Sequence, residues 1–315
     1  MITQNTKHKI QNTKLYDVII IGAGPAGLSA ALYAYRYKLS TLVLGKDLGG
    51  ALLNISEVEN FPGQKKLEGR ELADLFLKRV KNKVRIRREG VLDVLKVKGE
   101  FLIKAEENTY KAKKIIITTG VSRKRIGVPG EKEFERRGVG YCAVCDAPIF
   151  KNKKVAVVGG GNAALHAAIL LAQYAKEVTL LVRNELSADP ILIDHIEKDK
   201  KIKLVKKITI KEIKGSNFVE SITLSRKVKN KNILKVDGVF IEAGIKPVTD
   251  FLNHLKIKKD REGFLKVNSS MEASVKGLYA AGDISTGSDE LRQVVTASAE
   301  GAVSVTSIYN QLKER

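Results

Sequence analysis

The chain has few cysteines, few histidines and few aromatic residues, and each shortage excludes a class of site. Its 315 residues include two cysteines, four histidines and 6% aromatic residues. The histidines, at positions 8, 166, 195 and 254, form no pair with metal-ligand spacing, so they do not complete a zinc site with the cysteines. The scarce aromatic residues form no stacking platform for nucleic-acid bases. We therefore expect neither a metal centre nor a single-strand binding surface.

Long apolar runs are also missing. No stretch approaches the ~18 consecutive apolar residues that span a bilayer. The first fourteen residues, MITQNTKHKIQNTK, are polar and lack the apolar segment of a signal peptide. We therefore expect a cytoplasmic protein without a membrane partner. Its 43% hydrophobic residues and its length are typical of two domains with substantial cores.

Acidic residues are fewer than basic residues. The chain has 56 Lys and Arg against 35 Asp and Glu, which gives a formal net charge of +21. The basic residues are dispersed, as in VKNKVRIRR and KDKKIKLVKK, and no groove-binding motif accompanies them. This pattern disfavours nucleic acid as a partner. It indicates a solvated basic surface that favours encounters with acidic proteins and anionic cofactors.

The two cysteines that are present lie in the stretch GYCAVCDAP, at Cys142 and Cys145. A heme attachment is excluded because Asp146, and not histidine, follows the second cysteine. Two interpretations stay open, a buried and inert pair of thiols or a redox disulfide. Residues i and i+3 of one helical turn meet the ~5 to 6 Å Cα separation of a disulfide. A cysteine pair in a reducing compartment is more often catalytic than structural.

A first dinucleotide-binding pattern stands near the start, in LYDVIIIGAGPAGLSAALYAYR. It predicts a buried strand over 17–21, then Gly22, Gly24 and Gly27, then a helix to about Lys38. The first glycine allows a tight turn, the second lets backbone N–H groups approach a pyrophosphate, and the third lets helix and strand pack closely.

The same design returns in KKVAVVGGGNAALHAAILLAQYAKEVTLLVRN. It predicts a strand over 155–158, a turn with Gly159, Gly161 and Ala164, a helix to about Tyr174 and a strand over 178–182. Two such units imply two dinucleotides, or one dinucleotide and a vestigial site. The pairing suggests a flavoprotein that takes electrons from a nicotinamide, with the cysteine pair just before the second unit.

Two further stretches support the first unit as the flavin site. KKIIITTG predicts a strand that ends in Thr119 and Gly120, and GLYAAGDISTG predicts a strand that ends in Gly282 and Asp283. The helix predicted from RQVVTASAEGAVSVTSIYNQL follows it. An acidic residue at the carboxyl end of a parallel strand can direct its carboxylate toward a ribityl-pyrophosphate region. An ordinary helix cap is the alternative for Asp283.

The order of these motifs resembles the low-molecular-weight thioredoxin reductase family, the class II FAD-dependent pyridine nucleotide-disulfide oxidoreductases. GAGPAG, GGALLNISEVENFPG, ITTG, YCAVCDA, VVGGGNAA, YAAGD and RQVVTASAEG follow one another over nearly the whole chain. The resemblance implies an α/β fold of two Rossmann-like domains, the second inserted into the first. Residues 1–121 and 246–315 would form the FAD-binding domain and residues 122–245 the NAD(P)H-binding domain, with GVSRKRIGVPG and AGIKPVTD as hinges.

The resemblance also implies site residues. For FAD they are Gly22, Gly24, Pro25, Ala26, Gly27, Gly49, Gly50, Ala51, Asn60, Thr119, Gly120, Gly282, Asp283, Arg292, Gln293 and Val294. For NAD(P)H they are Gly159, Gly161, Asn162, Ala163, Ala164, Arg183 and Glu185. The implied activity is reduction of a thioredoxin-like protein by a homodimer, with a domain rotation between the two half-reactions.

By the same resemblance, Cys145 faces the flavin, Cys142 attacks the partner's disulfide, and Asp146 is the acid that protonates a thiolate. A cysteine pair at a helix start would have a thiolate pKa lowered by the helix dipole. A solvated turn residue is the alternative for Asp146.

We call each glycine-containing turn, together with the helix start that follows it, a cradle. The chain departs from the family after the second cradle. NADPH-using members have a His-Arg-Arg cluster and a further Arg there, whereas this sequence reads LVRNELSA and keeps only Arg183. Glu185 suits a ribose 2′-hydroxyl, or is a helix-start residue with no ligand. His166 stands where the family has an acidic residue, and we interpret it as an ordinary helix-face side chain.

The electron donor and the acceptor therefore stay open at this point. NADPH, NADH and another donor such as ferredoxin or a deazaflavin are all compatible with the residues. One rival function is a flavin-dependent dithiol oxidase that uses O2. Another is a redox-sensing or nucleic-acid-binding flavoprotein with a basic surface.

Overall fold

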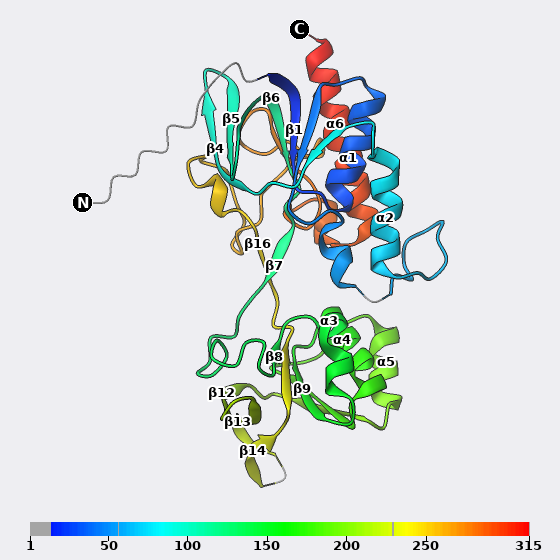
Figure 1. Ribbon diagram of the computed structural model, residues 1–315, viewed down its shortest axis with the longest axis vertical. Coiled ribbons are helices and arrows are strands. Elements are labelled where there is room, and N and C mark those ends of the chain that lie inside the picture. The colour runs from blue at the N-terminus through cyan, green and yellow to red at the C-terminus, as the bar shows by residue number, and fades with distance from the viewer. Residues whose placement is uncertain (1–13, 56, 229, 315) are drawn as a thin grey trace, which may run out of the picture. The chain divides into compact units, whose positions relative to one another are not determined.

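The computed structural model describes residues 14–55, 57–228 and 230–314 of the chain, and Figure 1 shows its elements. The polar N-terminal segment considered above lies outside these residues except for Lys14. The chain divides into two compact units. Unit 1 comprises Met1–Ser122 and Lys246–Arg315, and unit 2 comprises Arg123–Ile245. None of the helices in the described part has the length and apolar character that crossing a membrane requires.

Unit 1 is built on one seven-stranded sheet. Its strands are β1 (Leu15–Ile21), β2 (Thr41–Leu44), β3 (Arg85–Arg87), β4 (Val91–Val97), β5 (Glu100–Ala105), β6 (Thr109–Ile117) and β17 (Leu278–Ala280). The order is β3-β2-β1-β6-β5-β4, and β17 pairs with the second half of β6. The β3-β2-β1-β6-β17 part is parallel, and the β4-β5 hairpin joins the first half of β6 in antiparallel pairing. The carboxyl ends of the parallel strands therefore share one edge of the sheet.

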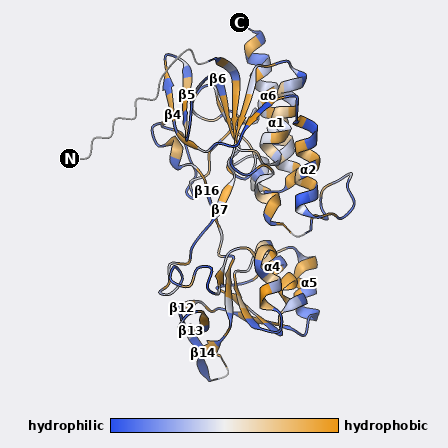
Figure 2. Ribbon diagram, in the orientation of Figure 1, coloured by the Kyte–Doolittle hydropathy of each residue, from blue (hydrophilic) through white to orange (hydrophobic). Residues whose placement is uncertain are grey.

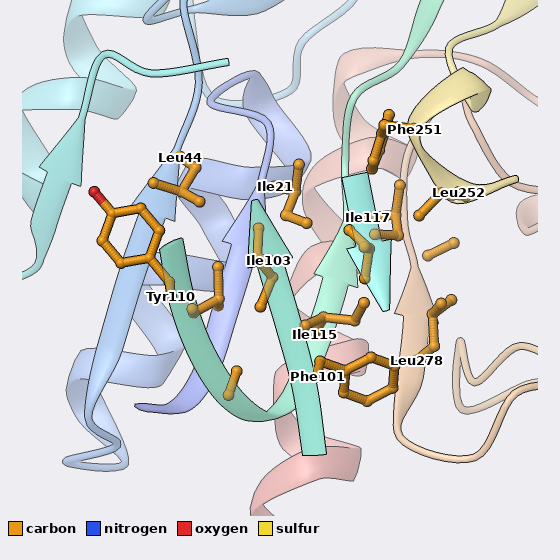
Figure 3. Close-up of a cluster of buried hydrophobic side chains, with 14 of the residues drawn as sticks. Ile21, Leu44, Phe101, Ile103, Tyr110, Ile115, Ile117, Phe251, Leu252 and Leu278 are labelled. Carbon is orange, nitrogen blue, oxygen red and sulfur yellow. The ribbon is translucent and has the colours of Figure 1, made fainter. Parts of the chain in front are cut away.

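The two faces of this sheet bury alternate residues of each strand, as a period of two requires. Its helices are α1 (Pro25–Arg36), α2 (Gly69–Val80) and α6 (Val294–Lys313), with one-turn helices η1 (Gly50–Asn54), η3 (Asp250–Leu252) and η4 (Ser288–Glu290). Val18 and Ile20 of β1 pack with α1 and α6 residues. Ile19 and Ile21 face a second cluster, shown in Figure 3, that includes Ile103 of β5.

Unit 2 contains a second parallel sheet and a separate antiparallel one. The parallel strands are β8 (Val139–Gly140), β9 (Lys154–Val158), β10 (Glu177–Val182), β11 (Ile202–Lys206) and β15 (Gly238–Ile241), in the order β11-β10-β9-β15-β8. The antiparallel strands are β12 (Ile210–Gly215), β13 (Val219–Val228) and β14 (Lys231–Lys235). The helices are α3 (Ala143–Asp146), α4 (Asn162–Tyr174) and α5 (Pro190–Lys198), with η2 (Ala147–Phe150) after α3.

The parallel sheet of unit 2 is covered on both faces. Val155 and Val157 of β9 pack in a cluster with α4 residues, whereas Ala156 packs with residues of β12 and β13. Figure 2 shows the central strands coloured as hydrophobic and the helices carrying both kinds of residue. The chain passes between the units through β7 (Val121–Arg123) and β16 (Ile245–Pro247), which pair with each other.

The observed elements confirm the α/β fold with two Rossmann-like halves. One helix and one strand end earlier than expected from the sequence. The first helix ends at Arg36 and not near Lys38, because Lys38 has a φ of 55°, outside the helical region. The strand expected to end at Gly120 ends at Ile117, and a turn follows in which Gly120 has a φ of 63°. The β12–β14 sheet was not expected from the sequence.

Candidate active site

The two cysteines form a disulfide at the start of α3. Their Cα atoms are 5.4 Å apart, within the range expected for residues of one helical turn. Cys145 is exposed and Cys142 is half-buried. The redox-disulfide interpretation is thus favoured over a buried pair of inert thiols. The disulfide belongs to unit 2, directly after β8.

The helix at the disulfide is shorter than the sequence argument assumed. α3 has four residues, and the one-turn helix η2 follows it at once. So short a helix has a small dipole, which weakens the expectation that the dipole lowers a thiolate pKa. The structure offers a local donor instead, because the backbone N–H of Cys145 donates to Sγ of Cys142 at 3.2 Å. That contact would stabilise a thiolate on Cys142.

Asp146 ends α3 and packs against the neighbouring strands. Its carboxyl lies beside Gly140 of β8, where a Cβ atom would come within 3.2 Å of Oδ2 and 3.1 Å of the Phe240 ring. The side chain is half-buried, and this burial raises the pKa of Asp146 above its ordinary value. A carboxyl group that holds its proton more firmly is better suited to act as an acid than a solvated one.

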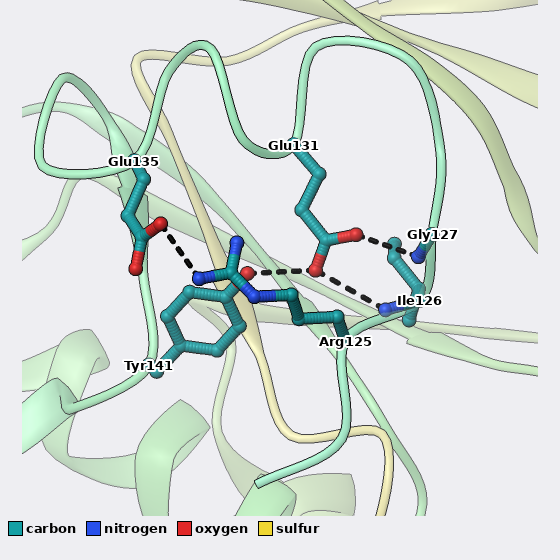
Figure 4. A network of polar contacts seen from close by, with 6 residues as sticks. All are labelled: Arg125, Ile126, Gly127, Glu131, Glu135 and Tyr141. Atoms are coloured by element: carbon teal, nitrogen blue, oxygen red, sulfur yellow. Dashed lines mark hydrogen bonds and ion pairs between the residues drawn. The ribbon is translucent and has the colours of Figure 1, made fainter. Parts of the chain in front are cut away.

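A polar network around the buried Glu131 precedes the cysteines in the sequence (Figure 4). The hydroxyl of Tyr141, the residue before the disulfide, donates to Glu131 at 2.7 Å. Glu131 is 3% exposed and also accepts from the backbone N–H groups of residues 126–127. Arg125 lies over the Tyr141 ring and pairs with Glu135 at 2.8 Å. These contacts fix the chain that enters the disulfide, and no sequence motif indicated them.

The first glycine turn lies between β1 and α1 and combines two closed positions with one open position. A Cβ at Gly22 would lie 2.2 Å from the carbonyl oxygen of Thr118, and one at Gly27 would lie 2.1 Å from the carbonyl oxygen of Gly22. A Cβ at Gly24 would lie 3.7 Å from the Cα atom of Gly50, which is an ordinary van der Waals distance. The outer glycines therefore serve internal packing, whereas the packing tolerates a Cβ at the middle glycine. The N-terminus of α1, which directly follows Gly24, suits a bound pyrophosphate.

Several residues of distant segments gather around this first cradle. The backbone N–H of Gly49 donates to Ala23 at 2.8 Å, and Gly50 lies against Gly24. A Cβ at Gly282 would touch Ala26 at 3.0 Å. Pro25 and Ala26 begin α1, Ala51 lies in η1, Thr119 and Gly120 follow β6, and Val294 is the first residue of α6. Most of the expected FAD-binding set thus surrounds one edge of the unit 1 sheet.

The remaining members of that set form two pairs. Asn60 donates to the side-chain oxygen of Gln293 at 2.9 Å, across 233 residues of sequence. Arg292 approaches the carbonyl oxygen of Asp283 at 3.4 Å, and its guanidinium lies over the Phe264 ring. Burial raises the pKa of Asp283, and the charge of Arg292 counteracts this effect. A half-buried carboxyl group at this edge suits hydrogen bonding to the hydroxyl groups of a ligand.

One residue of this edge was missed by the sequence analysis. Glu300 of α6 is 5% exposed, and its carboxylate accepts from the backbone N–H of Gly282 at 2.7 Å and from the hydroxyl of Ser285. It therefore holds the loop that carries Asp283. No local motif marks a helix glutamate of this kind, because its partners lie in another segment.

The second glycine turn, between β9 and α4, repeats the same arrangement in unit 2. A Cβ at Gly159 would lie 2.3 Å from the carbonyl oxygen of Glu242, whereas one at Gly161 would have no neighbour closer than 3.8 Å. Asn162, Ala163 and Ala164 form the first turn of α4. Gly160 packs closely against β10, because a Cβ there would lie 2.8 Å from the Val182 side chain. The N-terminus of α4, which directly follows Gly161, again suits a dinucleotide pyrophosphate.

The charged residues expected near the second cradle follow β10. Arg183 and Glu185 are both exposed. The carboxylate of Glu185 accepts from Lys206 at 2.8 Å, and this contact lowers the pKa of Glu185. No sequence motif marks Lys206. His166 is exposed on α4, as expected for a helix-face side chain.

Fold and site together define a dinucleotide-dependent disulfide oxidoreductase with two cradles and one redox-active cysteine pair. The chain belongs to the pyridine nucleotide-disulphide oxidoreductase family, whose model matches residues 16–301. It is 40% identical over 306 residues to a thioredoxin reductase of Bacillus subtilis, with 96% of both chains covered. Membership of this family, together with that relative, implies FAD and NAD(P)H as cofactors.

Solved structures agree with this assignment. The thioredoxin reductase of T. acidophilum superposes with a TM-score of 0.89 at 36% identity, covering 95% of this chain and 99% of the other. The Lactococcus lactis thioredoxin reductase in its FR conformation also gives 0.89, at 32% identity, covering 95% and 100%.

Proposed function

We propose that this protein is an FAD-dependent thioredoxin reductase that passes electrons from NAD(P)H to the disulfide of thioredoxin. The observation that carries the proposal is the Cys142–Cys145 disulfide, held at a helix start in the unit that also bears a dinucleotide cradle. The family and the names of the relatives support thioredoxin as the acceptor and disfavour the oxidase alternative. FAD, when bound, supplies electron-pair transfer between the nicotinamide and the disulfide.

We assign the cofactors from the two glycine turns. We infer that residues 1–121 and 246–315 bind FAD, because Gly50 lies against Gly24 and Gly282, which precedes Asp283, lies against Ala26 at the start of α1. Residues 122–245 would then bind NAD(P)H above Gly161. The family resemblance further supports a homodimer that works in the cytoplasm.

The reaction of the chain's own residues with the partner is a dithiol exchange. The thiolate of Cys142 attacks one sulfur of the partner's disulfide, which forms a mixed disulfide and releases a partner thiolate. Cys145 then attacks Sγ of Cys142, so the internal disulfide forms again and the second partner thiol leaves. Two electrons pass to the partner in this exchange. Asp146 supplies a proton to a departing thiolate, which its raised pKa supports.

A direct test is anaerobic mixing of the purified yellow protein with NADPH or NADH while the flavin absorbance near 450 nm is followed. We expect one of the two to bleach the flavin and oxidised thioredoxin to restore the colour. If neither nucleotide bleaches a flavin that dithionite does bleach, the nicotinamide-dependent function is wrong. A protein that is bleached by dithiols and recovers only with O2 would instead be an oxidase.

Asp146 gives a prediction with opposite effects on activity and stability. Because its folded-state pKa is raised, its stabilising contribution is present below the unfolded value near 3.8 and is lost as pH rises through the folded pKa. Once the pH exceeds the folded-state pKa, the half-buried carboxyl is ionised, which costs stability. Asp146→Asn should therefore raise the midpoint of thermal unfolding increasingly as pH rises through that pKa, with no gain below about pH 4, where the wild-type carboxyl is neutral.

The same variant should lose about a hundredfold in thioredoxin turnover, since it cannot supply a proton. The matched control is Asp74→Asn on α2, an exposed aspartate in unit 1, which should change neither quantity. Calorimetry from about pH 3 to 8 and a thioredoxin assay measure both effects. Unchanged turnover in Asp146→Asn would reduce Asp146 to a structural turn residue.

A further inference from the structure

An ion pair that no motif indicated lies beyond the carboxyl end of β10. Parallel pairing places Lys206, the last residue of β11, beside Val182, the last residue of β10. Arg183 follows Val182 directly, and Glu185 two residues later contacts Lys206. Lys206, the last residue of β11, and Arg183, the residue after β10, thus lie at neighbouring positions where the chain leaves the sheet.

A side chain of the antiparallel sheet forms hydrogen bonds with the backbone at Lys206. Arg226 of β13 donates to the carbonyl oxygen of Lys206 at 2.7 Å and to that of Lys207 at 3.0 Å. Lys207 has a φ of 56°, which turns the chain sharply after β11. A side chain that leaves such a fixed turn has a defined starting point, unlike a lysine on a frayed loop.

This ion pair lies next to the second cradle because the segment after β10 is fastened to the glycine turn. The backbone N–H of Ser187 donates to Gly160 at 2.8 Å, and that of Asp189 donates to the side chain of Asn162 at 2.7 Å. A dinucleotide with its pyrophosphate above Gly161 extends its adenosine ribose past the end of the second strand of the unit, here β10. The ion pair therefore lies where the 2′-position of that ribose is read.

Positive charge dominates this position. Its charged side chains are Arg183, Lys206, Lys207 and Arg226 against Glu185 and Glu197. The carboxylate of Glu185 pairs with Lys206 through Oε2 and so offsets part of this positive charge in the absence of a ligand. A phosphate dianion in place of this carboxylate would gain contacts with two cations.

We propose that Lys206, together with Arg183, binds the 2′-phosphate of NADPH, and that Glu185 is a built-in counter-ion that the phosphate displaces. This inference rests on the proposed function and makes it more specific, because it selects NADPH over NADH. Lys206 belongs to a different strand from the arginine cluster expected by resemblance. The lost arginines are therefore replaced from β11.

The test measures nucleotide binding by the FAD-loaded protein and does not depend on turnover. Adenosine 2′,5′-bisphosphate and adenosine 5′-monophosphate are titrated calorimetrically into wild type, Lys206→Gln, Lys206→Arg and Glu185→Gln. We expect Lys206→Gln to weaken the bisphosphate about tenfold and the monophosphate less than about twofold. Lys206→Arg should restore binding, and Glu185→Gln should tighten the bisphosphate because its competitor is gone.

Lys203→Gln is the matched control. Lys203 lies on the same strand and forms the same kind of lysine–glutamate pair, with Glu177, but near the start of β10. It should leave both affinities unchanged. The expected difference between the two ligands should also shrink as salt rises from about 0.05 to 0.5 M, since the contacts are exposed.

Three results would overturn the inference. Equal binding of both ligands by wild type excludes a 2′-phosphate site. If Glu185→Gln is the variant that loses affinity, and it loses it for the monophosphate, Glu185 binds a ribose hydroxyl and the chain uses NADH. A Lys206→Gln variant that binds like wild type removes Lys206 from the site. Thioredoxin reduction with NADH as well as NADPH is measured in parallel, so a wrong nucleotide assignment is distinguished from a wrong function.

Discussion

Replacing Cys142 with serine should abolish thioredoxin reduction, with a fall in turnover on the order of a thousandfold or more. The chain has only two cysteines, so no third thiol can take over the exchange. Serine cannot form the internal disulfide and is a poor nucleophile at neutral pH. Cys145→Ser should lose turnover to a similar extent, because both cysteines act as one unit. The FAD content should stay unchanged in both variants, since the disulfide belongs to unit 2.

The two serine variants also separate the roles of the cysteines. A thioredoxin with one remaining active-site cysteine, activated as a mixed disulfide with thionitrobenzoate, releases a coloured thiolate when a thiol attacks it. Cys145→Ser retains Cys142, whose sulfur receives the backbone N–H at 3.2 Å, and should form a stable adduct with release of one equivalent. Cys142→Ser should react far more slowly. The reverse order would assign the attack on the partner to Cys145, the more exposed cysteine in the structure.

The glycine turns and the disulfide could be predicted from the sequence because the physical requirements of each are local. The strand, glycine and helix patterns at Gly22 and Gly159 predicted cradles at both places, since a positive φ and close backbone approach restrict those positions to glycine. The cysteine spacing likewise indicated a disulfide within one helical turn. Each of these signals lies within about ten to thirty residues of chain.

The parts that sequence reasoning missed depend on contacts between distant segments. Lys206 was one lysine in a basic stretch until β10 and β11 paired, and Glu300 acquires its role only where α6 meets the loop after β17. The Asn60–Gln293 contact spans 233 residues and rested on family resemblance alone. No periodicity or spacing reports such pairings, because the sheet order that creates them is set by the whole fold.

Gly24→Ala should deprive the protein of FAD while leaving its fold intact. Gly24 has φ of −82° and ψ of −171°, which alanine adopts without strain, and a Cβ there would touch no protein atom closer than 3.7 Å. The methyl group would instead occupy the space assigned to the pyrophosphate, which should weaken FAD binding about ten- to a hundredfold. The ratio of absorbance at 450 to 280 nm and the unfolding midpoint of the FAD-free protein measure the two effects.

Gly22→Ala and Gly27→Ala are the contrasting variants. Their Cβ atoms would lie 2.2 and 2.1 Å from backbone oxygens, so the FAD-free protein itself should be destabilised. If Gly24→Ala destabilises the FAD-free protein as much as they do, Gly24 is required for packing, and the pyrophosphate site predicted there is wrong.

The corresponding change in unit 2, Gly161→Ala, should have the complementary effect. Gly161 also has a backbone conformation open to alanine, with φ of −95° and ψ of 179°, and a Cβ there would have no neighbour closer than 3.8 Å. The variant should retain FAD and bind NAD(P)H about ten- to a hundredfold more weakly, so dithionite but not nicotinamide reduces its flavin readily. Loss of FAD from Gly161→Ala, with FAD retained by Gly24→Ala, would exchange the two cofactors between the cradles. The two alanine variants together therefore decide which unit binds which dinucleotide without any change in the disulfide.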